Sequence, residues 1–172
     1  MDFIHYTLQW CKGEILEASI FGTAGLVILL SGIAFGWFGS TPSAKAMMIP
    51  LIVLGAIGLT TGVFGVVNNT QRMTTFAEQY HEDPAGFVAE EKQRVEGFEK
   101  IFRITYPLAI AFALGGLALF FLFSNAHANA IGVTLLMLAT QGLVVDMFAA
   151  ERGEIYYKHI LEAQAASERT AP

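Results

Sequence analysis

Four long stretches with almost no charge constrain this sequence more than any other feature. Between Ala18 and Val67 the only charged residue is Lys45, and between Ile104 and Ala150 the only one is Asp146. Charged residues make up 15% of the 172 residues, whereas about a quarter is usual for a soluble domain. Because a soluble fold of this length cannot bury so much apolar surface, the sequence predicts a lipid environment.

The apolar stretches predict four transmembrane helices, each of about 20 residues, the length needed to cross the hydrocarbon of a bilayer. The four predicted spans are residues 19–38, 46–67, 105–123 and 128–149. Helices are expected because lipid offers no hydrogen-bond partner to a free backbone amide. The first two spans and the last two are joined by short segments of turn-forming residues, so each pair is expected to be antiparallel.

These features together predict an all-α integral membrane four-helix bundle with antiparallel up-down topology. Residues 1–166 are expected to form one domain, and residues 167–172 a disordered tail. The distribution of lysine and arginine predicts the orientation, because such residues stay on the cytoplasmic side. Nine lie on one side of the membrane, against Lys45 alone on the other: Lys12, Arg72, Lys92, Arg94, Lys100, Arg103, Arg152, Lys158 and Arg169. The sequence therefore predicts a multi-pass protein of a plasma membrane or bacterial inner membrane with both termini cytoplasmic.

The central segment, residues 68–104, is expected to continue the second and third spans into the cytoplasm as a helical hairpin. Phe76 and Tyr80 occur at helical spacing, and Asp83-Pro84 is typical of an N-cap followed by proline in the first turn. The tip of the hairpin is therefore predicted near residues 81–83.

Residues 1–18 admit two interpretations. A broken apolar stripe that begins with Ile4 and Leu8 favours a helix continuous with the first span. Alternatively, the segment lies flat on the membrane, with Trp10 among the headgroups and a bend at Gly13.

Glycines spaced by four residues, Gly32 with Gly36 and Gly58 with Gly62, allow helices to approach closely. These faces pack either within one protomer or between protomers. Membrane lipid is the expected partner, together with further copies of the chain or a membrane complex. The net charge of −5 gives no reason to expect nucleic-acid binding.

Asp146 is the most unusual residue, because an ionisable group within a span suggests a functional site. It lies near the cytoplasmic end of its span, so a structural ion pair is the alternative interpretation. Gln141 lies deeper in the same span but about 140° around the helix, and it supports a continuous polar path only weakly.

Several charged residues of the predicted cytoplasmic part are candidates for a shared site. Glu91 interrupts an apolar stripe, and Glu14, Glu151, Arg152 and His159 are expected at a similar depth. Of these, Glu91, Glu151 and His159 are weak candidates for a carboxylate-rich metal site. Ordinary surface ion pairs are the alternative.

The group Asn68, Asn69 and Arg72 lies where the second span leaves the membrane. These residues are candidates for binding a lipid phosphate, or alternatively for capping exposed backbone groups.

No catalytic signature is present: the sequence contains no phosphate-binding glycine loop, nucleophile elbow, Cys-x-x-Cys or His-Glu-x-x-His. No cofactor is expected. The first hypothesis is therefore a non-enzymatic membrane protein, a small transport, channel or accessory subunit with a polar site at the cytoplasmic boundary. The alternative is a membrane-embedded enzyme or a lipid- or metal-binding protein with a carboxylate and histidine site at that interface.

Overall fold

The computed structural model describes residues 2–170, apart from the side chains at positions 99–102, 168 and 170. Within these residues the chain is helical throughout except at its turns, and it contains no strand. The helices are α1 (Phe3–Phe38), α2 (Pro42–Glu82), α3 (Pro84–Leu122) and α4 (Ala126–Thr170).

Local capping signals set the breaks between the helices. The Thr41 side chain accepts a hydrogen bond from the Ala44 backbone N–H at 3.2 Å, with Pro42 as the first residue of α2. Asp83 caps α3 in the same way, by accepting from the Gly86 N–H at 3.0 Å. Such side-chain caps satisfy backbone donors that the first turn of a helix leaves free. The break between α2 and α3 therefore falls at the tip that the sequence indicates.

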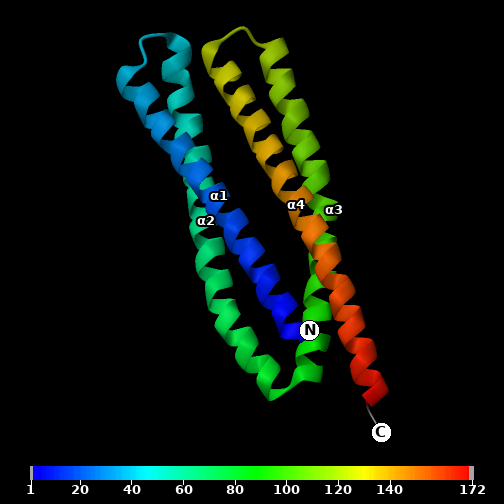
Figure 1. The fold of residues 1–172 in the computed structure, drawn as a ribbon. Helices are drawn as coiled ribbons and strands as arrows, with labels where there is room; N and C mark the ends of the chain where they lie inside the picture. The colour runs from blue at the N-terminus through cyan, green and yellow to red at the C-terminus, as the bar shows by residue number, and fades with distance from the viewer. Residues whose placement is uncertain (1, 171–172) are drawn as a thin grey trace.

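The helices lie side by side as two pairs, α1 with α2 and α3 with α4 (Figure 1). The turns that join the members of each pair lie at one end of the molecule. The turn between α2 and α3 lies toward the other end, as do both ends of the chain (Figure 1). Aromatic contacts join the two pairs there, including those of Phe3 with Phe87 and with Tyr156.

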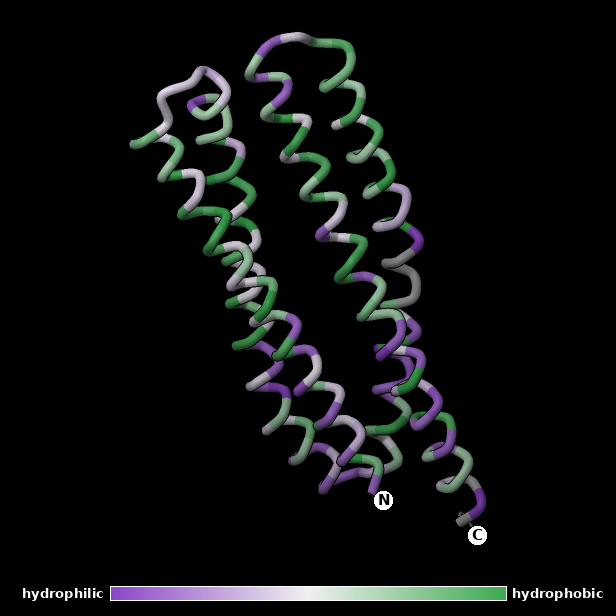
Figure 2. Tube along the Cα trace, turned by 45° about the horizontal axis from the view of Figure 1, so that its top comes forward, coloured by the Kyte–Doolittle hydropathy of each residue, from purple (hydrophilic) through white to green (hydrophobic). Residues whose placement is uncertain are grey.

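The molecule has an apolar half, residues 19–67 and 105–149, and a polar half, residues 2–18, 68–104 and 150–170 (Figure 2). Large apolar side chains point outward in the apolar half; for example, Phe64 is 69% exposed and Phe121 is 79% exposed. Each of the four helices is long and apolar enough to cross a membrane. These features support a multi-pass membrane protein, because lipid is the solvent in which such side chains are stable.

Close helix contact in the apolar half depends on glycine. A Cβ atom added to Gly58 would lie 3.1 Å from the Gly25 Cα, and one added to Gly32 would lie 2.8 Å from the Ile52 backbone nitrogen. These glycines therefore lie in the contact between α1 and α2 of one protomer, which is one of the two arrangements that their spacing allows.

Both chain ends are more regular than the sequence alone indicates. α1 runs unbroken from Phe3 through Gly13 to Phe38, so the N-terminal segment continues the first span as a helix. α4 extends to Thr170 and so includes residues 167–170 of the predicted tail. The alanine-rich stretch before them favours helix, and the Ser167 hydroxyl donates to the Ala163 carbonyl at 3.1 Å. Residues 171–172 lie outside the described residues.

Candidate functional site

Where the polar and apolar halves meet, α1, α2 and α4 enclose a pocket of about 290 Å³. We call it the boundary pocket and define it by six of the residues that line it: Glu14, Glu17, Phe21, Asn69, Gly142 and Asp146. The pocket therefore brings together Asp146, Glu14 and Asn69, three residues that the sequence singles out for different reasons.

Helix geometry explains how the carboxylates reach the pocket. Glu14 and Glu17 are three residues apart on α1 and so lie on one face of the helix. Asp146 enters from α4, half-buried, and no hydrogen bond or ion pair joins it to another described residue. Its carboxylate is therefore the unpaired charge of the pocket.

Asn69 contributes a buried amide from α2. The residue is 6% exposed, and its Nδ2 donates to the Gly65 carbonyl of the same helix at 2.9 Å. Its Oδ1 is buried and accepts no hydrogen bond from any described residue. A buried carbonyl-type oxygen without a donor is uncommon in folded proteins and calls for an explanation.

Arg152 provides the positive charge beside the pocket. One nitrogen, Nη2, donates to Glu14 Oε1 at 3.0 Å and also to Glu17 Oε2. Gly13 leaves space for this side chain, since a Cβ there would lie 3.0 Å from Arg152 Cδ. Three carboxylates and one guanidinium give the pocket and its edge a formal charge of −2.

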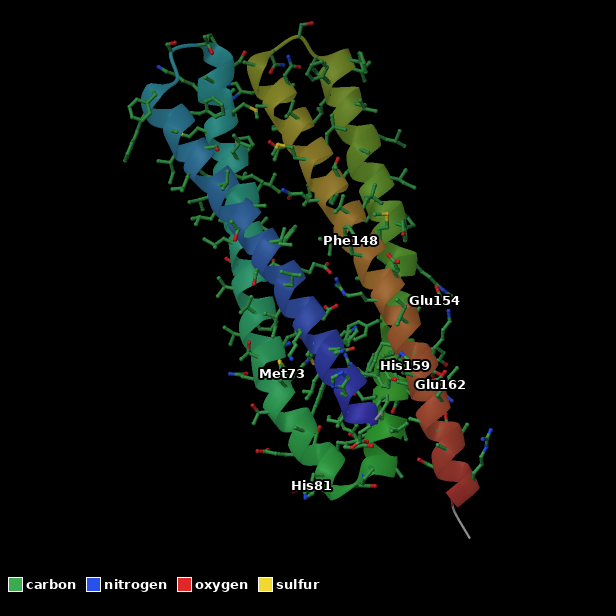
Figure 3. The ribbon with its side chains drawn as sticks, in the orientation of Figure 1. Met73, His81, Phe148, Glu154, His159 and Glu162 are labelled. Carbon is green, nitrogen blue, oxygen red and sulfur yellow. The ribbon has the colours of Figure 1, made fainter. Side chains whose placement is uncertain are left out.

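Gln141 belongs to a different groove. It lines an apolar space of about 400 Å³ between α1 and α4, together with Leu16, Ile20 and Phe148. Phe148 is labelled on α4 in Figure 3. Gln141 and Asp146 therefore face different spaces, in agreement with their separation around the helix axis.

Glu91 lies in a second polar cluster, inside the polar half. The side chain is 3% exposed and accepts from Arg94 through two hydrogen bonds of 2.7 and 2.6 Å. The Tyr156 hydroxyl of α4 lies 2.7 Å from Glu91 Oε2 and 2.9 Å from the Thr7 hydroxyl of α1. Glu91 is therefore fully engaged and joins α3 to α4 and, through Tyr156, to α1.

Aromatic rings surround the Arg94 guanidinium, with the Trp10 ring centre 4.4 Å and the Phe98 ring centre 5.3 Å from its Cζ. Burial opposes the charged form, but the hydrogen bonds and the negative charge of Glu91 outweigh it and raise the pKa of Arg94. Burial, and then Glu91, raise the pKa of the Tyr156 hydroxyl. The cluster is thus a charged pair with a neutral tyrosine. Such an arrangement is suited to holding helices together.

The weak metal candidates do not form a metal-binding group. Glu151 is exposed, Glu91 is held by Arg94, and His159 stacks on Tyr6 with ring centres 3.7 Å apart. His159 Nδ1 also lies 3.2 Å from Glu162, its neighbour on α4 in Figure 3. Across the described part of the chain, no three His, Cys, Asp or Glu side chains are close enough to hold a metal.

The three headgroup candidates on α2 have different surroundings. Asn69 lines the boundary pocket, whereas Asn68 and Arg72 are half-buried and take no part in its lining. Burial raises the pKa of the Cys11 thiol to about 11; the positive charge of Arg94, and to a smaller extent that of Arg72, oppose this shift.

Sequence analysis missed Glu17, Arg94 and Tyr156. Glu17 had a usable signal, since it shares a helix face with Glu14. Arg94 had the same kind of signal, since it lies three residues from Glu91 on α3. The contacts of Tyr156 depend on the packing of α4 against α1 and α3.

No protein-family model matches the chain, and no curated protein or solved structure matches it either.

Proposed function

We propose that this chain is a small transport, channel or accessory subunit that acts through the boundary pocket. In this proposal α1 to α4 cross a bacterial-type inner membrane as an antiparallel up-down bundle, with both termini and the α2–α3 turn in the cytoplasm. The four apolar helices support the crossing. The nine lysines and arginines of the polar half support the orientation.

The unpaired carboxylate of Asp146 carries the proposal. Placing an ionisable group at the centre of a bilayer costs at least about 2.5 kcal/mol. Asp146 lies near the end of its span, so the free-energy cost of its charge is smaller. No ion pair or hydrogen bond with a described residue offsets that cost. Arg152, the next cation along α4, is engaged by Glu14 and Glu17 instead. A half-buried carboxylate that forms no ion pair is better suited to an exchangeable ligand than to structure.

The proposed orientation is tested by cysteine labelling in a Cys11→Ser background. Ser43 and Ala85 are both exposed, the first beside the α1–α2 turn and the second beside the α2–α3 turn. In intact spheroplasts, a membrane-impermeant maleimide should label Ser43→Cys at once and Ala85→Cys only after permeabilisation. Labelling of Ala85→Cys in intact spheroplasts would contradict the cytoplasmic location of that turn.

Flux measurements test the transport and channel part of the proposal. The purified protein is reconstituted into vesicles loaded with a pH-sensitive dye, and a potassium gradient with valinomycin imposes the membrane potential. We expect protein-dependent proton flux that Asp146→Asn abolishes. Glu151→Gln is the matched control, because Glu151 is an exposed carboxylate on the same helix. Equal flux through wild type and Asp146→Asn would remove Asp146 from the mechanism, and no flux above protein-free vesicles would exclude a proton channel or proton-coupled role.

A further inference from the structure

We infer that the boundary pocket binds a small organic ammonium ion, held by Asp146 and by the Asn69 Oδ1. This inference builds on the proposed function, because it names the ligand class of the same site.

The boundary pocket carries more negative than positive charge. Glu14, Glu17 and Asp146 all line the pocket, and Arg152 is the cation bound to its edge. Because the formal charge is −2, an anionic ligand such as a phosphate group would be repelled. The bound guanidinium of Arg152 also shows that this carboxylate pair can hold a nitrogen cation through N–H donors.

The buried amide of Asn69 provides an acceptor oxygen without a donor, and this observation is independent of the charge. Asn69 lines the pocket, and its buried Oδ1 accepts no hydrogen bond from any described residue. A ligand that donates hydrogen bonds would satisfy this oxygen and the Asp146 carboxylate together. An ammonium group carries three N–H donors and a positive charge, so it suits two acceptors of this kind.

Size and lining indicate an organic cation rather than a bare metal ion. The pocket volume of about 290 Å³ is far larger than the roughly 10–15 Å³ that a cavity needs to hold one water. The carboxylates do not gather closely enough to coordinate a metal directly, as judged from the described residues. Phe21, Leu138 and Val145 supply apolar lining for a short carbon chain, and Gly142 leaves room beside them. An aromatic face also attracts cations.

Calorimetric titration of the detergent-purified full-length protein tests the inference. The probes are putrescine with two ammonium groups, n-butylamine with one, uncharged n-butanol and MgCl₂. We expect the amines to bind and n-butanol to give no saturable heat. Saturable binding of n-butanol with the affinity of n-butylamine would overturn the inference, as would Mg²⁺ binding that Asp146→Asn removes while the amines fail to bind.

Charge variants locate the binding. Asp146→Asn should weaken amine binding by about 10- to 100-fold, the value of one charge-assisted hydrogen bond. Glu151→Gln should leave the affinity unchanged. Equal losses in the two variants would indicate a general effect of surface charge and would contradict a site at Asp146.

A variant that fills the pocket volume tests the inference without removing any carboxylate. A Cβ atom added to Gly142 meets no atom within 4 Å, so Gly142→Leu should fold and fill part of the pocket. Gly115→Leu is the matched control, because Gly115 is equally open but lies on α3, outside the pocket lining. Amine binding should be lost in Gly142→Leu and kept in Gly115→Leu; binding retained in both would place the ligand elsewhere.

The binding and flux experiments can fail separately. Amine binding that depends on Asp146, in a protein that conducts no protons, supports this inference and contradicts a proton path through Asp146. Asp146-dependent flux in a protein that binds no amine supports the transport role and overturns the ammonium ligand.

Discussion

The hydroxyl of Tyr156 lies 2.7 Å from Oε2 of Glu91, and this contact joins α4 to α3 inside the polar half. Both residues are almost fully buried, at 2% and 3% exposure. The hydroxyl also lies 2.9 Å from the hydroxyl of Thr7, which brings α1 into the same cluster. The two helix pairs are thus joined in the polar half by a hydrogen-bonded cluster as well as by apolar packing.

Removal of the hydroxyl should destabilise the protein with little loss of packing. We expect Tyr156→Phe to lower the free energy of unfolding by about 1–3 kcal/mol, because Glu91 loses a buried donor. Chemical unfolding in detergent, followed by circular dichroism, measures this change. Tyr157→Phe is the control, since the Tyr157 hydroxyl bonds to Glu96 at an exposed site. A Tyr156→Phe protein as stable as this control would show that the contact contributes nothing.

The ion pair of Glu91 with Arg94 should behave as a buried pair. Arg94→Met leaves the Glu91 charge without its partner, and we expect a loss of about 3–5 kcal/mol. The double variant Glu91→Leu/Arg94→Met removes both charges and should recover most of that loss. The same unfolding experiment compares wild type, the single variants Arg94→Met and Glu91→Leu, and the double variant. If the losses of the single variants simply add in the double variant, the two side chains are not coupled.

Cys11 should be unreactive in the folded protein. The side chain is fully buried, and burial raises its pKa from 9.0 to about 11. Iodoacetamide at pH 8 should therefore alkylate the native protein far more slowly than the protein unfolded in urea and detergent, because the thiolate is the reactive form. Similar rates in the two states would contradict the burial of this thiol.

The raised pKa of Cys11 also predicts that the stability of the protein depends on pH. Because the folded state binds the Cys11 proton more tightly, the contribution of this group is complete below pH 9 and is lost as the pH rises through about 11. Cys11→Ala should flatten the decrease in stability over that window. An identical decrease in wild type and variant would assign it to other groups, such as Tyr80, whose pKa burial and the hydrogen bond to Asp2 raise to about 12.

Local signals explain why the helices were predictable. The breaks at Thr41-Pro42 and Asp83-Pro84 depend on capping side chains adjacent in sequence to the turns that they form. The apolar stretches likewise follow from composition alone, because each extends over the whole length of a span.

The sequence allowed several residues of the candidate site to be named, but not the partners that each of them contacts. Sequence analysis grouped Glu14 and Glu91 at a similar depth, but Glu14 binds Arg152 whereas Glu91 binds Arg94 and Tyr156. Which side of a long helix faces which neighbour depends on tertiary packing, and sequence spacing within one helix does not determine it. The unpaired Oδ1 of Asn69 also depends on that packing, since burial is what removes its access to water.

Packing in the apolar half should tolerate no side chain at Gly25. A Cβ there would lie 2.6 Å from the carbonyl carbon of Gly58 and closer still to the Leu59 nitrogen. Because lipid is as apolar as leucine, helix association in a membrane depends on such close backbone contact. Gly25→Leu should therefore destabilise the α1–α2 pair by at least about 1–3 kcal/mol, the usual cost of overpacking. Gly115→Leu, a change at an open position of another span, should have little effect. Thermal unfolding in detergent compares the two variants, and equal midpoints would mean that α1 and α2 are not in contact at Gly25.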